Sequence, residues 1–408
     1  MFSPEERSAC RQPLEAEEGE ALDTIGDDTL YYTLASPLYR NARSDHWLIY
    51  DKGIKNARRR NFWIDYFNNE TMNSATMEMR PWCTRTSFKN ITILRKRNFK
   101  IYLKSSFFTD DLNLESIKTR GVLYSLQELT DRQKENGVIA ISTGNFAYPL
   151  CYFGKEFNIP VTIVMPQDVE EEKKQMCKNL GAKVESNGIN NMIEAHNTAL
   201  RIAREGRMFY LDGNDHPYMI TGQATLAVEI YEEITSRKKI DGKRIRIDVV
   251  ILPTTIDGCG LTACLAMFLK NWSEKLIIIE ARTEKQCPLI QDVRSQHKFP
   301  QTNIHGPECF IGQMDTSDKG LPHCWIDHCM TVSDANVQRA VSLLRERENI
   351  VDSHAAIGLA ALLDVQLMNL LRKKLAHLKI KRVLIPMFGR MDSPMDLTNR
   401  PGPAREHN

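Results

Sequence analysis

One lysine, Lys118, is placed where a side-chain amine could carry out chemistry. A lysine amine reacts near neutral pH when it is desolvated or crowded by positive charge, or when it is already joined to a carbonyl cofactor as an imine. The apolar residues 101–104 predict a short buried strand, and residues 121–129 have the apolar spacing of a helix. The sequence therefore predicts Lys118 at a strand-to-helix junction, and its surroundings favour the imine.

A polar turn follows the next predicted strand, which covers residues 137–142. This turn has the sequence Ser142-Thr143-Gly144-Asn145. Its backbone N–H groups and short polar side chains are suited to hold a carboxylate or a phenolic oxygen. We expect an anion-binding turn at this place.

A third turn lies between a predicted strand, residues 247–252, and a predicted helix, residues 262–271. A strand, a glycine-containing turn and a helix in this order direct backbone N–H groups at a phosphate, and the helix dipole adds to the attraction. The turn residues that could contact a phosphate are Thr254, Thr255, Gly258, Cys259 and Gly260. The carboxylate of Asp257 would repel the phosphate, and an ordinary turn that binds no ligand remains the alternative.

Predicted strands and helices alternate from residue 137 to residue 211. Such alternation indicates parallel strands, right-handed crossovers and a sheet covered on both faces. The predicted fold class is α/β, with two lobes built on twisted, mostly parallel sheets covered by helices. The predicted division is a disordered acidic tail (1–28), a divergent N-terminal extension (29–79), a large lobe (80–136 and 214–400) and a small lobe (137–213).

The composition is that of an ordinary globular chain, with 408 residues of which 42% are hydrophobic and 26% charged. A net charge of +2 without a basic face argues against nucleic-acid binding. No apolar run approaches membrane-spanning length, and the acidic start lacks the pattern of a secretory or transit peptide, so we expect a cytoplasmic protein with no membrane segment. Ten cysteines without a CxxC framework fit reduced, mostly buried thiols.

The three turns together with their order resemble one family. Ser116-Ile117-Lys118-Thr119-Arg120-Gly121 is similar to a lysine motif SFKxRG, and residues 142–145 match a Ser-x-Gly-Asn loop. Further landmarks follow in order, among them DHPYMITGQATLAVEI at 215–230 and the Gly258-Cys259-Gly260-Leu261 turn. This series resembles the fold-type II pyridoxal-phosphate enzymes, and within them the threonine/serine dehydratases and serine racemases. The resemblance implies a two-lobed fold and pyridoxal 5'-phosphate as cofactor.

The resemblance also implies roles for individual residues. Lys118 would carry the cofactor and remove the substrate Cα proton, and Asn145 would hydrogen-bond the ring hydroxyl. The turn at 142–145 would take the substrate carboxylate, and the turn ending at Gly260 would hold the cofactor phosphate. Met387 stands where the family has a hydroxyl or thiol partner for the pyridine nitrogen, and a thioether donates no hydrogen bond.

We predict no metal site. The segment 323–329 offers two His and two Cys, but tetrahedral sites usually draw their ligand pairs from separate turns, so buried thiols and surface histidines are favoured. The serine racemases hold a divalent cation through a Glu resembling Glu280 and an Asp six residues later, where this chain has Gln286.

Three functions stay open. The first is an ammonia-lyase that converts L-threonine or L-serine to a 2-oxo acid and ammonia. The second is a degenerate homologue that acts as a binding or regulatory protein. Met387 favours it, and so does the phosphate turn, where the resembling family has four glycines and this chain has Asp257-Gly258-Cys259-Gly260. The third is a serine racemase, in which Thr143 would supply the acid on the opposite face of Cα. The family implies a homodimer, and we expect no macromolecular partner beyond that.

Overall fold

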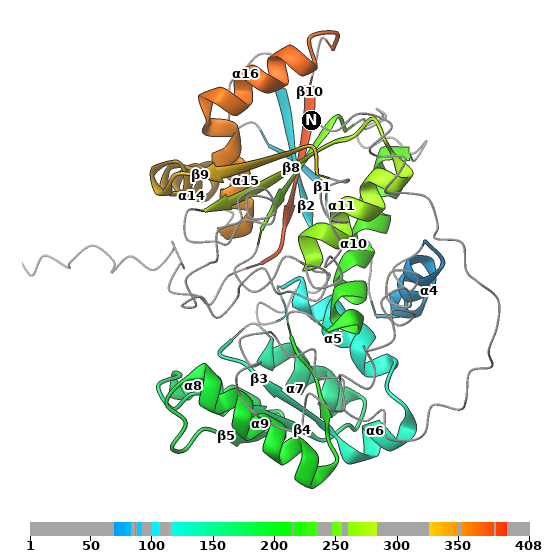
Figure 1. Cartoon of the computed structure of the whole chain (residues 1–408), viewed down its shortest axis with the longest axis vertical. Coiled ribbons are helices and arrows are strands. Elements are labelled where there is room, and N and C mark those ends of the chain that lie inside the picture. The colour runs from blue at the N-terminus through cyan, green and yellow to red at the C-terminus, as the bar shows by residue number, and fades with distance from the viewer. Residues whose placement is uncertain are drawn as a thin grey trace, which may run out of the picture.

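The computed structural model describes residues 69–82, 86, 88–91, 99–106, 114, 116–144, 146–213, 216–235, 247–254, 260–283, 326–348, 353–378 and 381–389. These residues form two β-sheets with helices packed on them, one in the upper half of Figure 1 and one in the lower half. The α/β class with mostly parallel sheets is confirmed. The predicted acidic tail and residues 29–68 of the predicted extension lie outside the described residues.

The larger sheet has six strands within the described part of the chain, in the order β1-β2-β10-β7-β8-β9. Their bounds are β1 (Phe88–Ile91), β2 (Phe99–Ser105), β7 (Val249–Pro253), β8 (Ile277–Thr283), β9 (His328–Val332) and β10 (Lys381–Met387). β1 is antiparallel to β2, and the other neighbours are parallel. Strand β10, late in the sequence, lies between β2 and β7, so it joins the two parts of the sheet.

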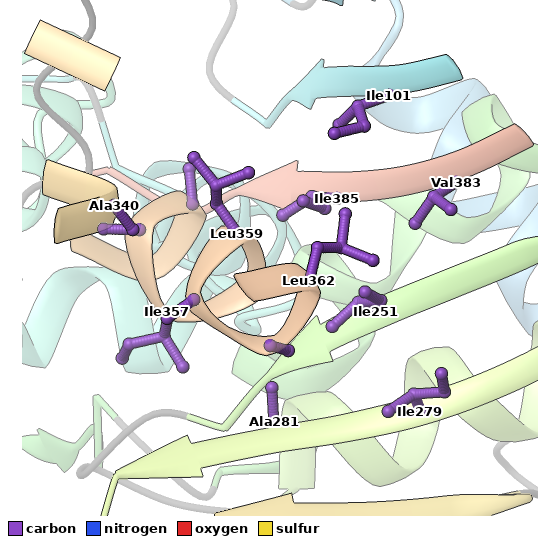
Figure 2. Close-up of a cluster of buried hydrophobic side chains, with 14 of the residues drawn as sticks. Ile101, Ile251, Ile279, Ala281, Ala340, Ile357, Leu359, Leu362, Val383 and Ile385 are labelled. Carbon is purple, nitrogen blue, oxygen red and sulfur yellow. The ribbon is translucent and has the colours of Figure 1, made fainter. Parts of the chain in front are cut away.

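Helices cover both faces of this sheet. On one face the core includes α14 (Asp334–Glu348), α15 (Ser353–Leu363) and α16 (Val365–Lys374). Figure 2 shows Leu362 of α15 lying between Ile251 and Ile385 of the strands. The alternate strand residues face the other way and pack with α10 (Pro217–Thr235) and α11 (Gly260–Trp272). Each such buried aliphatic side chain contributes about 1.5–3 kcal/mol, so both faces are closed by apolar packing.

The smaller sheet has four parallel strands among the described residues, in the order β5-β4-β3-β6. They are β3 (Val138–Ile141), β4 (Val161–Val164), β5 (Lys183–Glu185) and β6 (Phe209–Tyr210). The helices around them are α6 (Asp131–Asn136), α7 (Ala147–Glu156), α8 (Glu171–Asn179) and α9 (Met192–Gly206). Gly181, with a positive φ of 87°, follows α8, and a glycine adopts this left-handed conformation readily at a helix end.

In Figure 1, α5 (Lys118–Gln127) and the lower end of α10 lie between the two sheets, and α4 (Asn69–Met79) lies to the right of them. α5 and α10 approach closely, since a Cβ on Gly222 would lie 2.5 Å from the Arg120 carbonyl oxygen and 2.9 Å from the Gly121 Cα. α4 falls within the predicted extension, and it buries Met72 and Met79. The predicted domain boundaries themselves stay predictions.

No single helix in the described ranges is long and apolar enough to cross a membrane. One bent pair, α15 with α16 at 78°, meets that test by length and composition only.

Candidate active site

Lys118 is the first residue of α5, at the carboxyl end of the central strand β10. The Ile117 N–H donates to the Phe388 carbonyl oxygen at 2.9 Å, and Ser116 forms a β-bridge with Gly389. The Lys118 N–H donates to Ser116 Oγ at 3.2 Å, and its side chain is half-buried. The segment before α5 is therefore joined to the end of β10, and the predicted strand-to-helix junction forms against a second strand.

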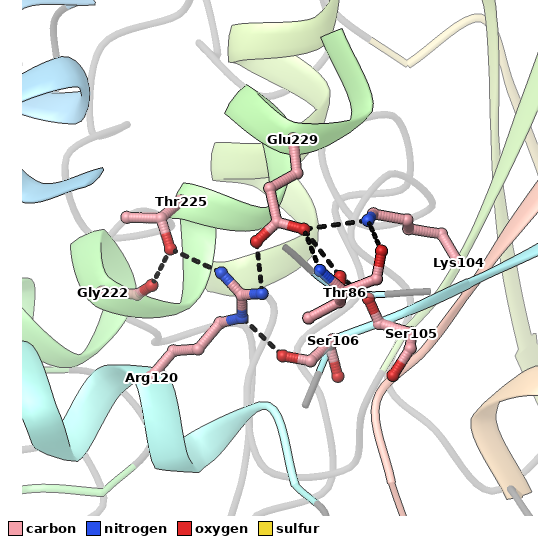
Figure 3. Close-up of polar contacts among 8 residues, drawn as sticks. All are labelled: Thr86, Lys104, Ser105, Ser106, Arg120, Gly222, Thr225 and Glu229. Atoms are coloured by element: carbon pink, nitrogen blue, oxygen red, sulfur yellow. Dashed lines mark hydrogen bonds and ion pairs between the residues drawn. The ribbon is translucent and has the colours of Figure 1, made fainter. Parts of the chain in front are cut away.

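Arg120 ties the same turn of α5 to the end of β2 and to α10. Its Nε donates to the Ser106 carbonyl oxygen, its Nη1 donates to Thr225 Oγ1 at 3.2 Å, and its Nη2 lies 2.5 Å from Glu229 Oε1. Figure 3 shows these contacts around the guanidinium group. Lys118 thus lies between two contacts that hold the start of α5, the Ile117 hydrogen bond to the end of β10 and the Arg120 hydrogen bond to the end of β2.

The carboxylate of Glu229 is shared by two cations. Its Oε2 accepts from Lys104 Nζ at 2.8 Å, and from the hydroxyl and N–H of Thr86 at 2.6 and 3.1 Å. Burial alone would raise the pKa of Glu229, but the charges of Arg120 and Lys104 outweigh it and lower that pKa to about 2. Burial lowers the pKa of Lys104, and Glu229 opposes that shift. The network holds two basic groups and one acidic group in the interior.

Sequence pattern alone does not predict this network, although the sequence contains a signal for it. Lys104 belongs to the predicted buried strand at 101–104, and Glu229 belongs to an apolar helix. A buried charge needs a partner, so each of these residues indicates a buried ion pair. The sequence does not indicate which residue is the partner.

The predicted anion-binding turn lies at the carboxyl end of β3, in the smaller sheet. Ser142 is buried, and its Oγ accepts the N–H groups of Gly144 and Ala147, both at 3.1 Å. The Ser142 N–H donates to the Val164 carbonyl oxygen at 3.2 Å. Two N–H groups of the turn are therefore used within the protein, while the side chain of Thr143 is exposed. Asn145 lies outside the described residues.

The predicted phosphate turn is described only at its two ends. Thr254 is buried, and its Oγ1 donates to Glu280 Oε1 at 2.6 Å, so its hydroxyl proton is directed at a carboxylate. Cys329 Sγ donates to the other oxygen of Glu280 at 2.9 Å, and burial followed by the Glu280 charge raises the pKa of that thiol. Gly260 begins α11, whereas Thr255, Gly258 and Cys259 lie outside the described residues.

Met387 is the last residue of β10 and pairs with Ser105 of β2. It is buried, and its carboxyl-side neighbour Phe388 accepts the hydrogen bond from Ile117. The structure thus brings Met387 and Lys118 to the same edge of the larger sheet. Among the described residues, no three His, Cys, Asp or Glu side chains gather as a metal ion would require.

Residues 85–387 match the family described as "Pyridoxal-phosphate dependent enzyme". This range covers most of the chain. The chain belongs to this family. As a pyridoxal-phosphate dependent enzyme it has pyridoxal 5'-phosphate as its cofactor, which the resemblance in the sequence predicts.

Several known proteins are similar to this pyridoxal-phosphate dependent enzyme. The L-threonine ammonia-lyase of Thermotoga maritima is 29% identical over 275 residues, which are 65% of this chain and 63% of that protein, so the match spans less than two thirds of that relative. The L-threonine dehydratase catabolic TdcB of Staphylococcus aureus is 28% identical over 304 residues, 72% of this chain and 82% of the relative. The crystal structure of serine racemase from Dictyostelium discoideum has a TM-score of 0.62 at 18% identity, over 79% of this chain and 98% of that chain, and supports the fold.

The described residues fit this cofactor at its aldehyde and at its phosphate, whereas Met387 offers no donor to its ring nitrogen. Pyridoxal phosphate needs an amine for its aldehyde, a donor for its ring nitrogen and a cradle for its phosphate. Lys118 could supply the amine, and the start of α11 after β7 could face the phosphate. Ser106 Oγ is buried and lacks a hydrogen-bond partner among the described residues, and a buried hydroxyl of this kind suits a polar atom of a bound group.

Proposed function

We propose that this enzyme is an ammonia-lyase that converts L-threonine or L-serine to a 2-oxo acid and ammonia. The observation that carries the proposal is the position of Lys118, at the carboxyl end of β10 between the Ile117–Phe388 hydrogen bond and the Arg120 contacts. The relatives named L-threonine ammonia-lyase and L-threonine dehydratase support the substrate class.

Each residue has a defined task in this proposal. The amine of Lys118 takes the proton from the substrate Cα. The bound cofactor supplies the electron sink that makes this proton acidic. Ser142 holds the turn in shape through its two accepted hydrogen bonds, and Thr143 contacts the substrate carboxylate from its exposed position. Loss of the β-hydroxyl followed by hydrolysis gives the 2-oxo acid and ammonia.

Turnover with two amino acids tests the proposal. The purified protein is supplied with pyridoxal phosphate and then with L-threonine or L-serine, and formation of 2-oxobutanoate or pyruvate is followed. We expect product with the native chain and none with Lys118→Ala. Absence of product with both amino acids, from a protein shown to carry the cofactor, would overturn it.

A degenerate homologue without turnover is the second candidate. The hydrogen bond from Thr254 to Glu280 favours it, because this hydroxyl proton is then not directed at the cofactor phosphate. Met387 favours it too, since a thioether cannot donate to the ring nitrogen. Weak binding of the cofactor together with no turnover would select this candidate.

A serine racemase is the third candidate, and the exposed hydroxyl of Thr143 favours it. Conversion of L-serine to D-serine, measured by chiral chromatography, would select it.

The expected homodimer and the cytoplasmic location remain predictions, and light scattering of the purified protein tests the dimer.

A further inference from the structure

We propose that Glu229 is a positioning residue for Lys118 and acts through Arg120. The proposal rests on the role of Lys118 under the proposed function. It concerns how the protein holds the first turn of α5, and it is independent of which amino acid is the substrate.

The two oxygens of Glu229 have different tasks. Oε2 contacts the larger sheet and its surroundings, because Lys104 belongs to β2 and Thr86 donates both its hydroxyl and its N–H. Oε1 contacts the guanidinium group of Arg120 on α5. The carboxylate of α10 therefore links the sheet to the helix that begins with Lys118.

Arg120 is placed to fix the rotation of α5. Arg120 follows Lys118 by two residues, which is about 200° around a helix. Accordingly, Arg120 is buried on one side, while Lys118 is half-buried on another. A rotation of α5 that moved Lys118 would pull the guanidinium group away from Glu229 and from Ser106.

A single anchor would leave this rotation open. The hydrogen bond from Ile117 to Phe388 holds the start of α5 on β10, and the helix could still turn about that point. The guanidinium group adds a second fixed point on the other side of Lys118, on β2 and α10. Both contacts are needed to fix the position of the Lys118 Cα and the direction in which its side chain leaves the helix.

Stability alone is a weak explanation for this network. A buried ion pair is often no more stabilising than apolar residues of the same size, although removing one partner costs about 3–5 kcal/mol. Here one carboxylate contacts two cations, and the charge of Glu233 also acts on Lys104.

Three substitutions separate the contact of Glu229 with Arg120 from its contact with Lys104. Glu229→Gln removes the shared charge, and its amide can turn an oxygen to only one cation. Arg120→Lys keeps the charge but loses the planar fork that serves three acceptors at once. Lys104→Met removes the ammonium group that contacts Glu229 Oε2 and leaves the contact between Arg120 and Glu229 Oε1 in place.

Attachment of pyridoxal phosphate to the cofactor-free protein is the readout. The rate is followed by visible absorbance, and the modified peptide is identified by mass spectrometry after borohydride reduction. We expect Glu229→Gln and Arg120→Lys to slow attachment at Lys118 by about tenfold or more, because a displacement of about 1 Å is costly in a positioned reaction. Lys104→Met removes one of the two residues that contact Glu229 Oε2 and leaves Thr86 in place, so it is expected to slow attachment less than Arg120→Lys does.

Thermal unfolding of each cofactor-free variant separates positioning from general damage. Ile230→Val, a buried change one residue from Glu229, is the matched control and is expected to react at the native rate. If Glu229→Gln does not fold, Glu229→Asp replaces it, since it keeps the charge but is too short to reach both cations.

Attachment rates that simply follow the loss of melting temperature, with Lys104→Met as slow as Arg120→Lys, would overturn the proposal. Labelling of another lysine, or undiminished labelling of Lys118→Ala, would instead refute the assigned role of Lys118.

Discussion

The backbone N–H of Ile117 donates to the carbonyl oxygen of Phe388 at 2.9 Å, so the residue before Lys118 is joined to the residue after the last strand. This hydrogen bond brings the predicted reactive amine to the carboxyl edge of a parallel sheet. Ligands of open α/β sheets bind outside this edge, so the position of Lys118 agrees with its proposed role.

Replacement of Lys118 separates cofactor attachment from folding. Lys118 is half-buried, so Lys118→Ala is expected to leave the melting temperature of the cofactor-free protein nearly unchanged while abolishing the visible absorbance of the attached cofactor. Absorbance spectra and thermal unfolding check both points. A variant that still holds the cofactor covalently would contradict the assignment.

Glu229 is expected to make the protein sensitive to acid. Its pKa of 4.5 falls to about 2 on folding, so its contribution to stability is complete above pH 4.5 and is lost as the pH falls toward 2. The full difference corresponds to about 3 kcal/mol. Urea unfolding across this range should show a steeper loss for the native chain than for Glu229→Gln. Parallel curves would contradict the low pKa.

His216 is expected to weaken the fold at milder acidity. Burial lowers its pKa from 6.5 to about 3, so the unfolded chain binds a proton first and stability falls as the pH drops below 6.5. Between about pH 7.5 and pH 5 the loss is about 2 kcal/mol. In His216→Asn the amide oxygen could accept the Tyr218 N–H that now reaches Nδ1 at 3.2 Å, and a flatter dependence is expected. An unchanged slope in urea unfolding would argue against this residue as the source.

Gly222 is expected to resist substitution because α5 and α10 touch there. A Cβ would lie 2.8 Å from the Tyr124 Cβ and 2.5 Å from the Arg120 carbonyl oxygen, so Gly222→Ala should cost about 1–3 kcal/mol. Gly206→Ala is the control, since its added Cβ would meet the flexible side chain of Met208 at 3.1 Å. Chemical denaturation of both variants tests the contact, and equal effects would speak against a tight crossing.

Thr254 is expected to contribute more to the stability of the fold than to binding of the cofactor phosphate. Thr254→Val removes the donor to the buried Glu280 and should destabilise the protein by about 1–3 kcal/mol. Thr254→Ser keeps the hydroxyl and should retain most of the stability. Titration with pyridoxal phosphate should give similar affinities for both variants, whereas a selective loss of affinity in Thr254→Val would show that the hydroxyl reaches the cofactor.

The sequence predicts the parts of this structure that depend on local pattern. Alternating apolar segments predict the parallel strands of the smaller sheet, and the spacing around Lys118 predicts its junction. The contact between Lys104 and Glu229 joins residues 125 positions apart, and local pattern carries no information on such a pairing. Thr254 shows a second limit, because a hydroxyl next to a glycine turn favours a phosphate contact until the position of Glu280 is known.

The central place of β10 has a consequence for how the chain folds during synthesis. Strands β2 and β7 have no shared edge until β10 enters between them, so the larger sheet stays in two pieces while the ribosome makes most of the protein. The carbonyl group of Phe388 that receives Ile117 emerges at the same late stage. A nascent chain stopped before residue 381 should therefore expose apolar strand edges to chaperones and leave Lys118 without its place on the sheet.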